Sequence, residues 1–226
     1  MSALIGHENV LALLKRTVEG GRPSHAYLFV GREGVGKKLV AIRFASMLNC
    51  LANEVDPACD CRICRRVREG KHPDVIIEQP EKGMIRIDRV RNIQKIFRYP
   101  PIEGRFRVVV IDDAHTMNRQ AQNALLKTLE EPPPGRVLIL VTAKPALLLS
   151  TVRSRCRKIP FGSLPMEPLI ALIQQQIDLP IDQTRTLVVL AGGSAGKAFE
   201  LADSRYLEIR EEVLSILTEP DRKSVV

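Results

Sequence analysis

The chain has 226 residues, which is enough for one α/β domain and a small second domain. A hydrophobic fraction of 45% supports a buried core, and a net charge of +8, from 34 basic and 26 acidic residues, permits contact with nucleic acid or an acidic partner. No apolar run approaches the roughly 18 residues of a membrane helix, and the N-terminus lacks a signal pattern. We therefore expect a cytoplasmic protein without membrane contacts.

Strands and helices alternate along the first 162 residues. Short apolar runs predict buried strands at 26–30, 74–78, 107–112 and 137–142. Apolar residues at helical spacing predict helices at 7–19, 38–49, 86–98 and 118–130. Because this alternation is typical of a doubly wound parallel sheet, the sequence predicts an α/β domain over residues 1–162.

The character of the chain changes after Pro165, where no strong strand pattern appears. Apolar residues at helical spacing predict three short helices in this part, at 165–176, 182–191 and about 195–217. Residues 163–226 are therefore expected to form a small all-helical lid domain that ends in a tail.

The segment from Gly31 to Lys38 reads GREGVGKK and joins a predicted strand to a predicted helix. It fits the phosphate-loop pattern G-x-x-x-x-G-K-[ST] at every position except the last. Gly31, Gly34 and Gly36 let backbone N–H groups point at phosphate oxygens, and Lys37 supplies charge for the β- and γ-phosphates. Lys38 replaces the hydroxyl that ligates Mg²⁺. The context favours a P-loop fold, but a glycine-rich turn without a ligand is the alternative for this segment.

Two acids follow the third predicted strand, in the segment VVVIDDAH (108–115). A P-loop site carries its second half at such a strand end. Asp112 would lie beside Mg²⁺, directly or through water, and Asp113 takes the place where such ATPases usually carry glutamate. Because aspartate is one methylene shorter and in-line attack needs accurate positioning, we expect this site to be catalytically weak. A strand-end cap is the alternative interpretation of both residues.

Four of the five cysteines crowd into residues 50–64. In a cytoplasmic chain such clustering is typical of metal binding and not of disulfides. The densest basic patch overlaps this region and consists of Arg62, Arg65, Arg66, Arg68 and Lys71. This patch either contacts nucleic acid or forms an ordinary solvated surface.

Four segments together resemble one family: HAYLFVGREGVGKK (25–38), VVVIDDAHTMN (108–118), NALLKTLEEPPP (123–134) and TVRSRC (151–156). They are similar to the bacterial clamp-loader subunits of the AAA+ superfamily, which belong to the DNA polymerase III holoenzyme. The likeness spans roughly residues 2–202, and the NALLKTLEEPP run is highly specific. Lys38, the DDAHTMN segment and IRIDRVRNI (85–93) favour the delta-prime branch of this family over its gamma/tau motor branch.

The resemblance implies roles for the cysteines and for Thr142. Thr142 matches the sensor 1 position, where a polar side chain contacts the γ-phosphate or its water, although a β-branched residue at a strand end is an equal interpretation. The family's zinc module would use four thiolates in a closed structural site, and four reduced cysteines without metal are the alternative. Its ligands here would be Cys50, Cys59, Cys61 and Cys64. Cys156, far away in sequence, is expected to be a core thiol.

Arg155 lies in the segment Ser-Arg-Cys, which matches the SRC motif of clamp loaders. The resemblance implies that Arg155 acts as an arginine finger, which enters the ATP site of a neighbouring subunit and stabilises charge on the transferring phosphoryl group. In the helical domain, Gly196 replaces the sensor 2 arginine of active loaders, with Lys197 beside it. Together with Lys38 and Asp113, this is the third departure from an active ATPase site.

The resemblance therefore implies a delta-prime-like stator with gamma/tau and delta subunits as partners, which reaches the sliding clamp and primed DNA through the complex. Structural zinc is expected, ATP or ADP binding is left open, and Mg²⁺ binding is not expected. The chain's own ATPase activity should be weak or absent, although the holoenzyme is a DNA-directed DNA polymerase. The alternative is an ATP-hydrolysing gamma/tau-like motor. The family's C-terminal collar domain is expected to be absent from these 226 residues.

Overall fold

A computed structural model of the chain describes residues 5–52, 56, 58–204, 206, 209 and 213. The chain separates into two compact units. The larger unit comprises His7–Arg32 and Gly36–Gly162, and the smaller comprises Met1–Gly6, Glu33–Val35 and Ser163–Val226. Within the residues that the structure describes, we find no helix with the length and apolar character needed to cross a membrane.

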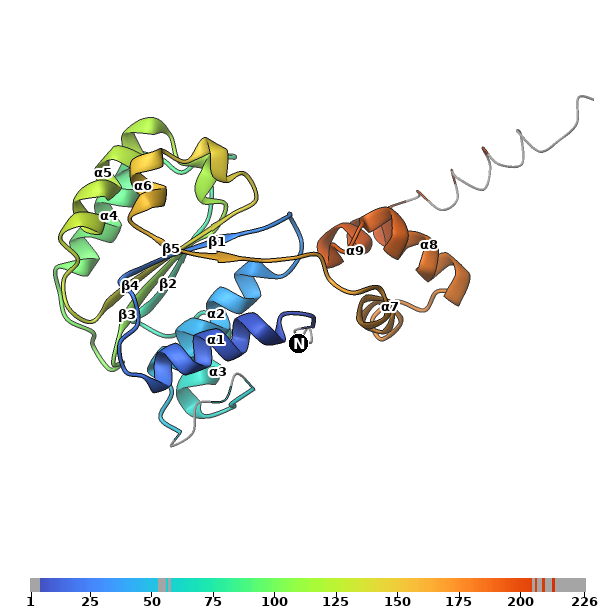
Figure 1. Ribbon diagram of the computed structural model, residues 1–226, viewed down its shortest axis with the longest axis horizontal. Helices are drawn as coiled ribbons and strands as arrows, with labels where there is room; N and C mark the ends of the chain where they lie inside the picture. Colours follow the sequence, from blue (N-terminus) through green and yellow to red (C-terminus); the bar gives the residue numbers. More distant parts are fainter. Residues whose placement is uncertain are drawn as a thin grey trace, which may run out of the picture. The chain divides into compact units, whose positions relative to one another are not determined.

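The larger unit is built on a five-stranded parallel sheet (Figure 1). Its spatial order is β2-β3-β4-β1-β5, and each neighbouring pair runs parallel. The strands are β1 (Ala26–Val30), β2 (Val75–Glu78), β3 (Arg107–Ile111), β4 (Arg136–Thr142) and β5 (Arg157–Pro160). The predicted α/β class is confirmed, and the first four strands lie where the sequence predicts them.

Helices cover both faces of this sheet (Figure 1). One face carries α1 (Glu8–Glu19), α2 (Lys37–Asn49) and α3 (Arg62–Arg68), and the other carries α4 (Ile87–Phe97), α5 (Arg119–Glu130) and α6 (Ser150–Ser154). Because successive strand residues point to opposite faces, Leu28 joins the core that contains residues of α4 and α5, whereas Tyr27 contacts Phe44 of α2 with ring centroids 5.0 Å apart. Helices α1, α2, α4 and α5 match their predicted ranges to within one residue at each end.

Strand β5 forms one edge of the sheet and pairs with β1 from Tyr27↔Arg157 to Val30↔Pro160. Its side chains are exposed except for Ile159, which is buried. An exposed run of Arg, Lys and Pro gives no apolar pattern, so the sequence does not predict this strand. Since the strands are parallel, the start of β5 lies at the amino edge of the sheet, and the loop that follows β1 lies at the carboxyl edge.

The smaller unit contains α7 (Met166–Gln174), α8 (Ile181–Ala191) and α9 (Ala195–Asp203). Buried residues of all three helices form its core, with Leu169, Val188 and Ala198 among them. The Ser194 hydroxyl begins α9 by accepting the N–H of Lys197 at 3.1 Å. The three helices confirm the helical character predicted for this part. The predicted helix of about 195–217 is observed as α9 up to Asp203, and most of its remaining residues lie outside the described part of the chain.

Candidate functional site

The segment from Gly31 to Lys38 leaves β1 and enters α2, which is the strand–loop–helix context that the sequence predicts. A Cβ atom on Gly31 would lie 2.6 Å from the carbonyl oxygen of Phe161, so this position requires glycine. Gly36 caps α2 with a left-handed φ of 98°, a conformation that favours glycine. Within the smaller unit, the Gly34 carbonyl accepts the N–H of Gly196 at 3.0 Å. Glycine is therefore required by close backbone approach at Gly31 and by backbone conformation at Gly36.

Two lysines open α2 in different surroundings. Lys37 is buried, and its ammonium donates to the Arg32 carbonyl at 2.6 Å, so the side chain folds over its own loop. Lys38 is partly exposed, and its Nζ lies 3.1 Å from Oδ2 of Asp112. This ion pair was not predicted, because the sequence identified each residue without indicating that they touch. The Lys38 ammonium thus contacts the acid that was expected to face Mg²⁺.

The acid pair follows β3, and its two members behave differently. Oδ1 of Asp112 accepts the N–H of Asp113 at 3.1 Å. Asp113 has a left-handed φ of 46°, which aspartate tolerates better than most residues, and it begins the short 3-10 helix at Ala114–Thr116. Its Oδ1 lies 4.0 Å from Nδ1 of His115. Asp112 is therefore the carboxylate that contacts Lys38, and Asp113 shapes the turn that follows.

Thr142 ends β4 and is fully buried. Its Oγ1 lies 3.3 Å from Nδ1 of His115 and accepts the N–H of Lys144 at 3.0 Å. Since β4 lies between β1 and β3, Thr142 stands at the carboxyl edge between the loop and the acid pair. Ligands of parallel α/β sheets usually bind at this edge. His115 was not among the predicted site residues, and no spacing in the sequence indicates its contact with Thr142.

Four thiols converge at the end of α2 and the start of α3. Cys50 Sγ lies 3.6 Å from Cys59 Sγ and 4.0 Å from Cys61 Sγ, and the four sulfur atoms, including that of Cys64, lie within 4.8 Å of one another. The Ala52 N–H donates to Cys50 Sγ at 3.4 Å. Burial raises the pKa of Cys50 in the metal-free chain, so a cation is what would keep this thiol deprotonated. These four cysteines could hold a metal ion.

The fifth cysteine, Cys156, lies apart from this group. It packs against the core of the larger unit, and burial raises the pKa of its thiol to about 12. It is therefore an unreactive core thiol at neutral pH, as the sequence analysis expects.

Most of the predicted basic patch is neutralised within its own region. Arg62 lies 3.9 Å from Glu103, and Arg66 donates to the same carboxylate. Arg68 pairs with Asp60, and Lys71 lies 3.0 Å from Glu69. This pairing favours an ordinary solvated surface over a nucleic-acid interface here, because phosphate contacts would have to displace the acids.

Arg155 caps the C-terminal end of α6, two residues before β5. Its Nη2 lies 2.9 Å from Oε1 of Glu130, at the end of α5, and its Nη1 donates to the Thr151 carbonyl at 3.0 Å. The guanidinium side chain remains 36% exposed. Arginine has five N–H donors, so these two contacts orient the group and leave donors for another acceptor. The sequence did not predict the role of Glu130.

A buried ion pair that the sequence did not predict organises the segment between α4 and β3. Asp74 is fully buried, and Oδ1 lies 2.9 Å from Arg107 Nη2. The same carboxylate accepts the N–H groups of Ile102, Glu103 and Gly104 at 2.7–2.9 Å. Asp74 was expected to begin β2, but the strand begins one residue later, at Val75.

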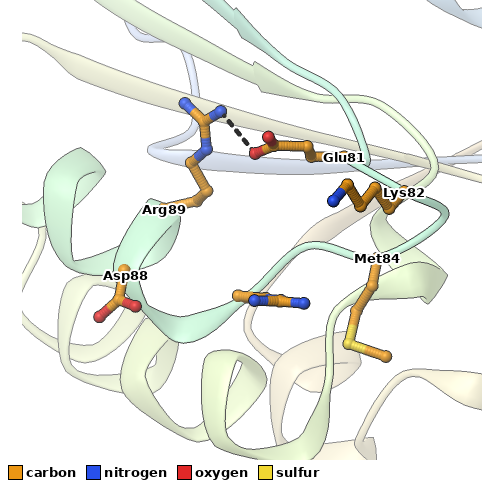
Figure 2. A pocket seen from close by; sticks show the side chains of 6 residues that line it. Glu81, Lys82, Met84, Asp88 and Arg89 are labelled. Atoms are coloured by element: carbon orange, nitrogen blue, oxygen red, sulfur yellow. Dashed lines mark hydrogen bonds and ion pairs between the residues drawn. The ribbon is translucent and has the colours of Figure 1, made fainter.

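A cavity of about 270 Å³ lies apart from the loop, at the start of α4 (Figure 2). An ion pair between Arg89 and Glu81, with a separation of 3.0 Å, borders it. Basic and acidic side chains nearly balance in this cavity, so its charge favours neither anions nor cations strongly. Its lining residues are Glu81, Lys82, Met84, Arg86, Asp88 and Arg89.

In comparisons with known proteins, the family model and the relatives all represent subunits of DNA polymerase III. A family model described as "DNA polymerase III, delta subunit" matches residues 6–165. The DNA polymerase III subunit delta' of Bacillus subtilis is 33% identical over 208 residues, which cover 92% of this chain and 63% of that protein. The DNA polymerase III subunit tau of Escherichia coli is 37% identical over 167 residues, which cover 74% of this chain and 26% of that protein.

A solved structure supports the fold. The crystal structure of a DNA polymerase III gamma-subunit-related protein from Thermotoga maritima matches with a TM-score of 0.55 at 24% identity, over 93% of this chain and 63% of that chain. The chain thus spans less than two thirds of each of these proteins. The AAA+ fold and the resemblance to delta-prime subunits are confirmed, and the matched residues make up more than half of the 226. The chain belongs to the DNA polymerase III delta subunit family.

Proposed function

We propose that the chain acts as a delta-prime-like stator of a bacterial clamp loader and presents Arg155 to the ATP site of a neighbouring gamma/tau-type subunit. Gamma/tau and delta subunits would be its partners, and the assembly would place a sliding clamp on primed DNA in the cytoplasm. Family membership supports the loader role. The position of Arg155, just before β5 at the amino ends of the strands, carries the finger role.

Arg155 lies near the amino ends of the strands, whereas the chain's own phosphate loop lies at their carboxyl ends. It precedes β5, which begins beside Tyr27 at the amino edge, whereas the loop follows Val30 at the carboxyl edge. Four strand residues separate these edges, which is about 13 Å at roughly 3.3 Å per residue. A guanidinium at this position therefore lies away from the phosphate loop of its own chain. If it serves a phosphoryl group, that group belongs to another subunit.

The contacts of Arg155 favour such a use in trans. The Glu130 carboxylate and the Thr151 carbonyl engage two N–H donors from its own chain, which reduces the rotamer freedom that the long side chain would lose on binding a phosphate. The pair is partly exposed, so water weakens it and a polyphosphate can compete with the carboxylate. The guanidinium is thus oriented without being buried.

The experiment that tests this role compares Arg155→Ala with the wild type in the loader assembled with its other subunits. Clamp loading should fall at least about tenfold, because a finger contributes about 10³–10⁵ in turnover at the site it serves. DNA-stimulated ATPase should fall by the share of that one site, because the other sites of the assembly keep their own fingers. Arg153→Ala is the matched control, since Arg153 lies on the same helix and is exposed. Gel filtration should show intact assemblies for both variants.

Unchanged ATPase and loading rates for Arg155→Ala in intact assemblies would refute the finger role. Loss of assembly with Arg155→Ala alone would assign the residue to the interface instead of to catalysis. Arg155→Lys separates charge from geometry, because lysine keeps the charge and lacks the planar fork. A rate close to that of Arg155→Ala is expected for this variant.

We also propose that the four cysteines hold structural zinc. In a tetrahedral site with Zn–S bonds of about 2.3 Å, the sulfur atoms stand about 3.8 Å apart. The separations of 3.6 and 4.0 Å from Cys50 Sγ to two partners agree with this geometry. Four thiolates leave no open position for chemistry. The site would therefore fasten the cysteine segment to α2 and α3.

A gamma/tau-like ATPase motor is the second candidate, because the Escherichia coli tau subunit is as similar as the delta' relatives. Lys37 and Asp112 are the residues that such a motor would use. We expect no Mg²⁺-dependent ATP turnover by the isolated chain above that of Lys37→Ala, because Lys38 replaces the metal-ligating hydroxyl. A phosphate-release assay checks this expectation. Turnover that Lys37→Ala abolishes would favour the motor.

A further inference from the structure

P-loop ATPases hold Mg²⁺ through the hydroxyl that follows the loop lysine, with an acid at a neighbouring strand end. Magnesium requires oxygen ligands in near-octahedral geometry. In this chain Lys38 takes the hydroxyl's position, and its Nζ lies 3.1 Å from Oδ2 of Asp112. An ammonium has no lone pair to offer a metal, and its charge repels one. The residues present therefore do not fit Mg²⁺.

Both oxygens of the Asp112 carboxylate are engaged. The Asp112 side chain is only 16% exposed, and its second oxygen accepts the Asp113 N–H at 3.1 Å. Lys38 stands in the first turn of α2, directly after the loop lysine. The Lys38 ammonium has three N–H donors, so pairing with one Asp112 oxygen leaves donors for a phosphate oxygen at the carboxyl edge of the sheet.

We propose that this loop binds the polyphosphate chain of a nucleotide without Mg²⁺, with the Lys38 ammonium in place of the metal ion. Lys37 and the N-terminal N–H groups of α2 supply the other favourable charges. The inference rests on the interpretation of residues 31–38 as a phosphate loop, and it does not depend on Arg155. A nucleotide bound in this way lacks the metal that activates phosphoryl transfer. The chain would therefore bind the nucleotide without hydrolysing it.

Fluorescent ADP and ATP, titrated into the full chain and followed by anisotropy, test the proposal in excess EDTA and in millimolar MgCl₂. The wild type should bind in EDTA, and MgCl₂ should change its Kd by less than about threefold. Lys38→Ser restores the hydroxyl and removes the ammonium. This variant should bind at least about tenfold more weakly than the wild type in EDTA and should recover in MgCl₂. Lys15→Ser is the control, because Lys15 pairs with Glu19 on the surface of α1.

Three outcomes would overturn the proposal. The first is wild-type binding that needs Mg²⁺, the second is the absence of binding in both solutions, and the third is a Lys38→Ser variant that binds like the wild type in EDTA. Circular dichroism should show that Lys38→Ser is folded, and Lys37→Ala should lose binding in both solutions. Because these are binding measurements on the isolated chain, their failure is distinguishable from a failure of the finger role, which the assembled loader reports.

Discussion

Replacing Asp74 with alanine is expected to lower the free energy of unfolding by about 3–5 kcal/mol, the cost of breaking a buried ion pair by removing one partner. The substitution leaves the buried guanidinium of Arg107 without its carboxylate. It also removes the acceptor of three backbone N–H groups in the segment before β3. Urea denaturation followed by circular dichroism measures the change.

Asp88→Ala is the matched control, because that aspartate is 83% exposed and its nearest basic partner, Arg91, lies 3.7 Å away. A surface pair of this kind contributes about 0–1 kcal/mol, so the control should unfold close to the wild type. Equal unfolding free energies for Asp74→Ala and Asp88→Ala would show that the buried pair does not stabilise the larger unit.

Acid should weaken the same interaction. Burial alone would raise the pKa of Asp74, but the backbone N–H donors and Arg107 outweigh burial and lower the pKa from 3.8 to about 2. A carboxyl whose pKa is lowered in the folded state adds stability above its unfolded pKa and loses that stability as the pH falls through the folded pKa. The contribution should therefore be complete at neutral pH and fade between pH 3.8 and about 2. Asp74→Asn, which does not titrate, should lack this part of the acid transition.

Loss of a ligand from the four-cysteine site is expected to have the second large effect. Cys61→Ser should release the zinc and lower the midpoint of thermal unfolding by more than about 5 °C, because structural zinc contributes directly to folding. Serine is well suited to this position, since Cys61 is the N-cap of α3 and serine is a favoured N-cap. The loss can then be assigned to the metal and not to the helix start. Elemental analysis and calorimetry provide the two measurements.

Cys156→Ala serves as the control for the zinc site. Its sulfur lies in the core of the larger unit and outside the group of four, so the variant should keep one zinc per chain. A Cys61→Ser variant that retains full zinc, or a wild type purified without any metal, would contradict the zinc proposal.

Four strands of the sheet and helices α1, α2, α4 and α5 could be predicted because their apolar residues repeat at strand or helix spacing. Strand β5 could not, since its exposed Arg157 and Lys158 leave no such repeat. Its place depends on pairing with β1, which is a tertiary contact. Helix α3 was also missed, because its surface arginines were interpreted as a charged patch and not as one face of a helix with Ile63 and Val67 buried.

The candidate site shows the same division. Glycine and lysine spacing predicted a phosphate loop, and the strand-end position predicted site roles for Asp112 and Asp113. What the sequence could not indicate is which side chains meet: Lys38 with Asp112, and Arg155 with Glu130. Each of these pairs joins residues of different elements, so only the folded sheet brings them together. Local sequence patterns therefore indicate the individual residues of such a site, and tertiary packing determines which of their side chains are in contact.

Strand β5 has a further consequence for how this chain meets other chains. An edge strand offers backbone N–H and C=O groups that a foreign strand could extend into a continuous, fibre-like sheet. Arg157 and Lys158 oppose such growth by charge, and Pro160 has no N–H to donate. The edge next to Arg155 is thus protected against backbone-to-backbone addition. A neighbour that approaches this edge would therefore have to be recognised mainly by side chains.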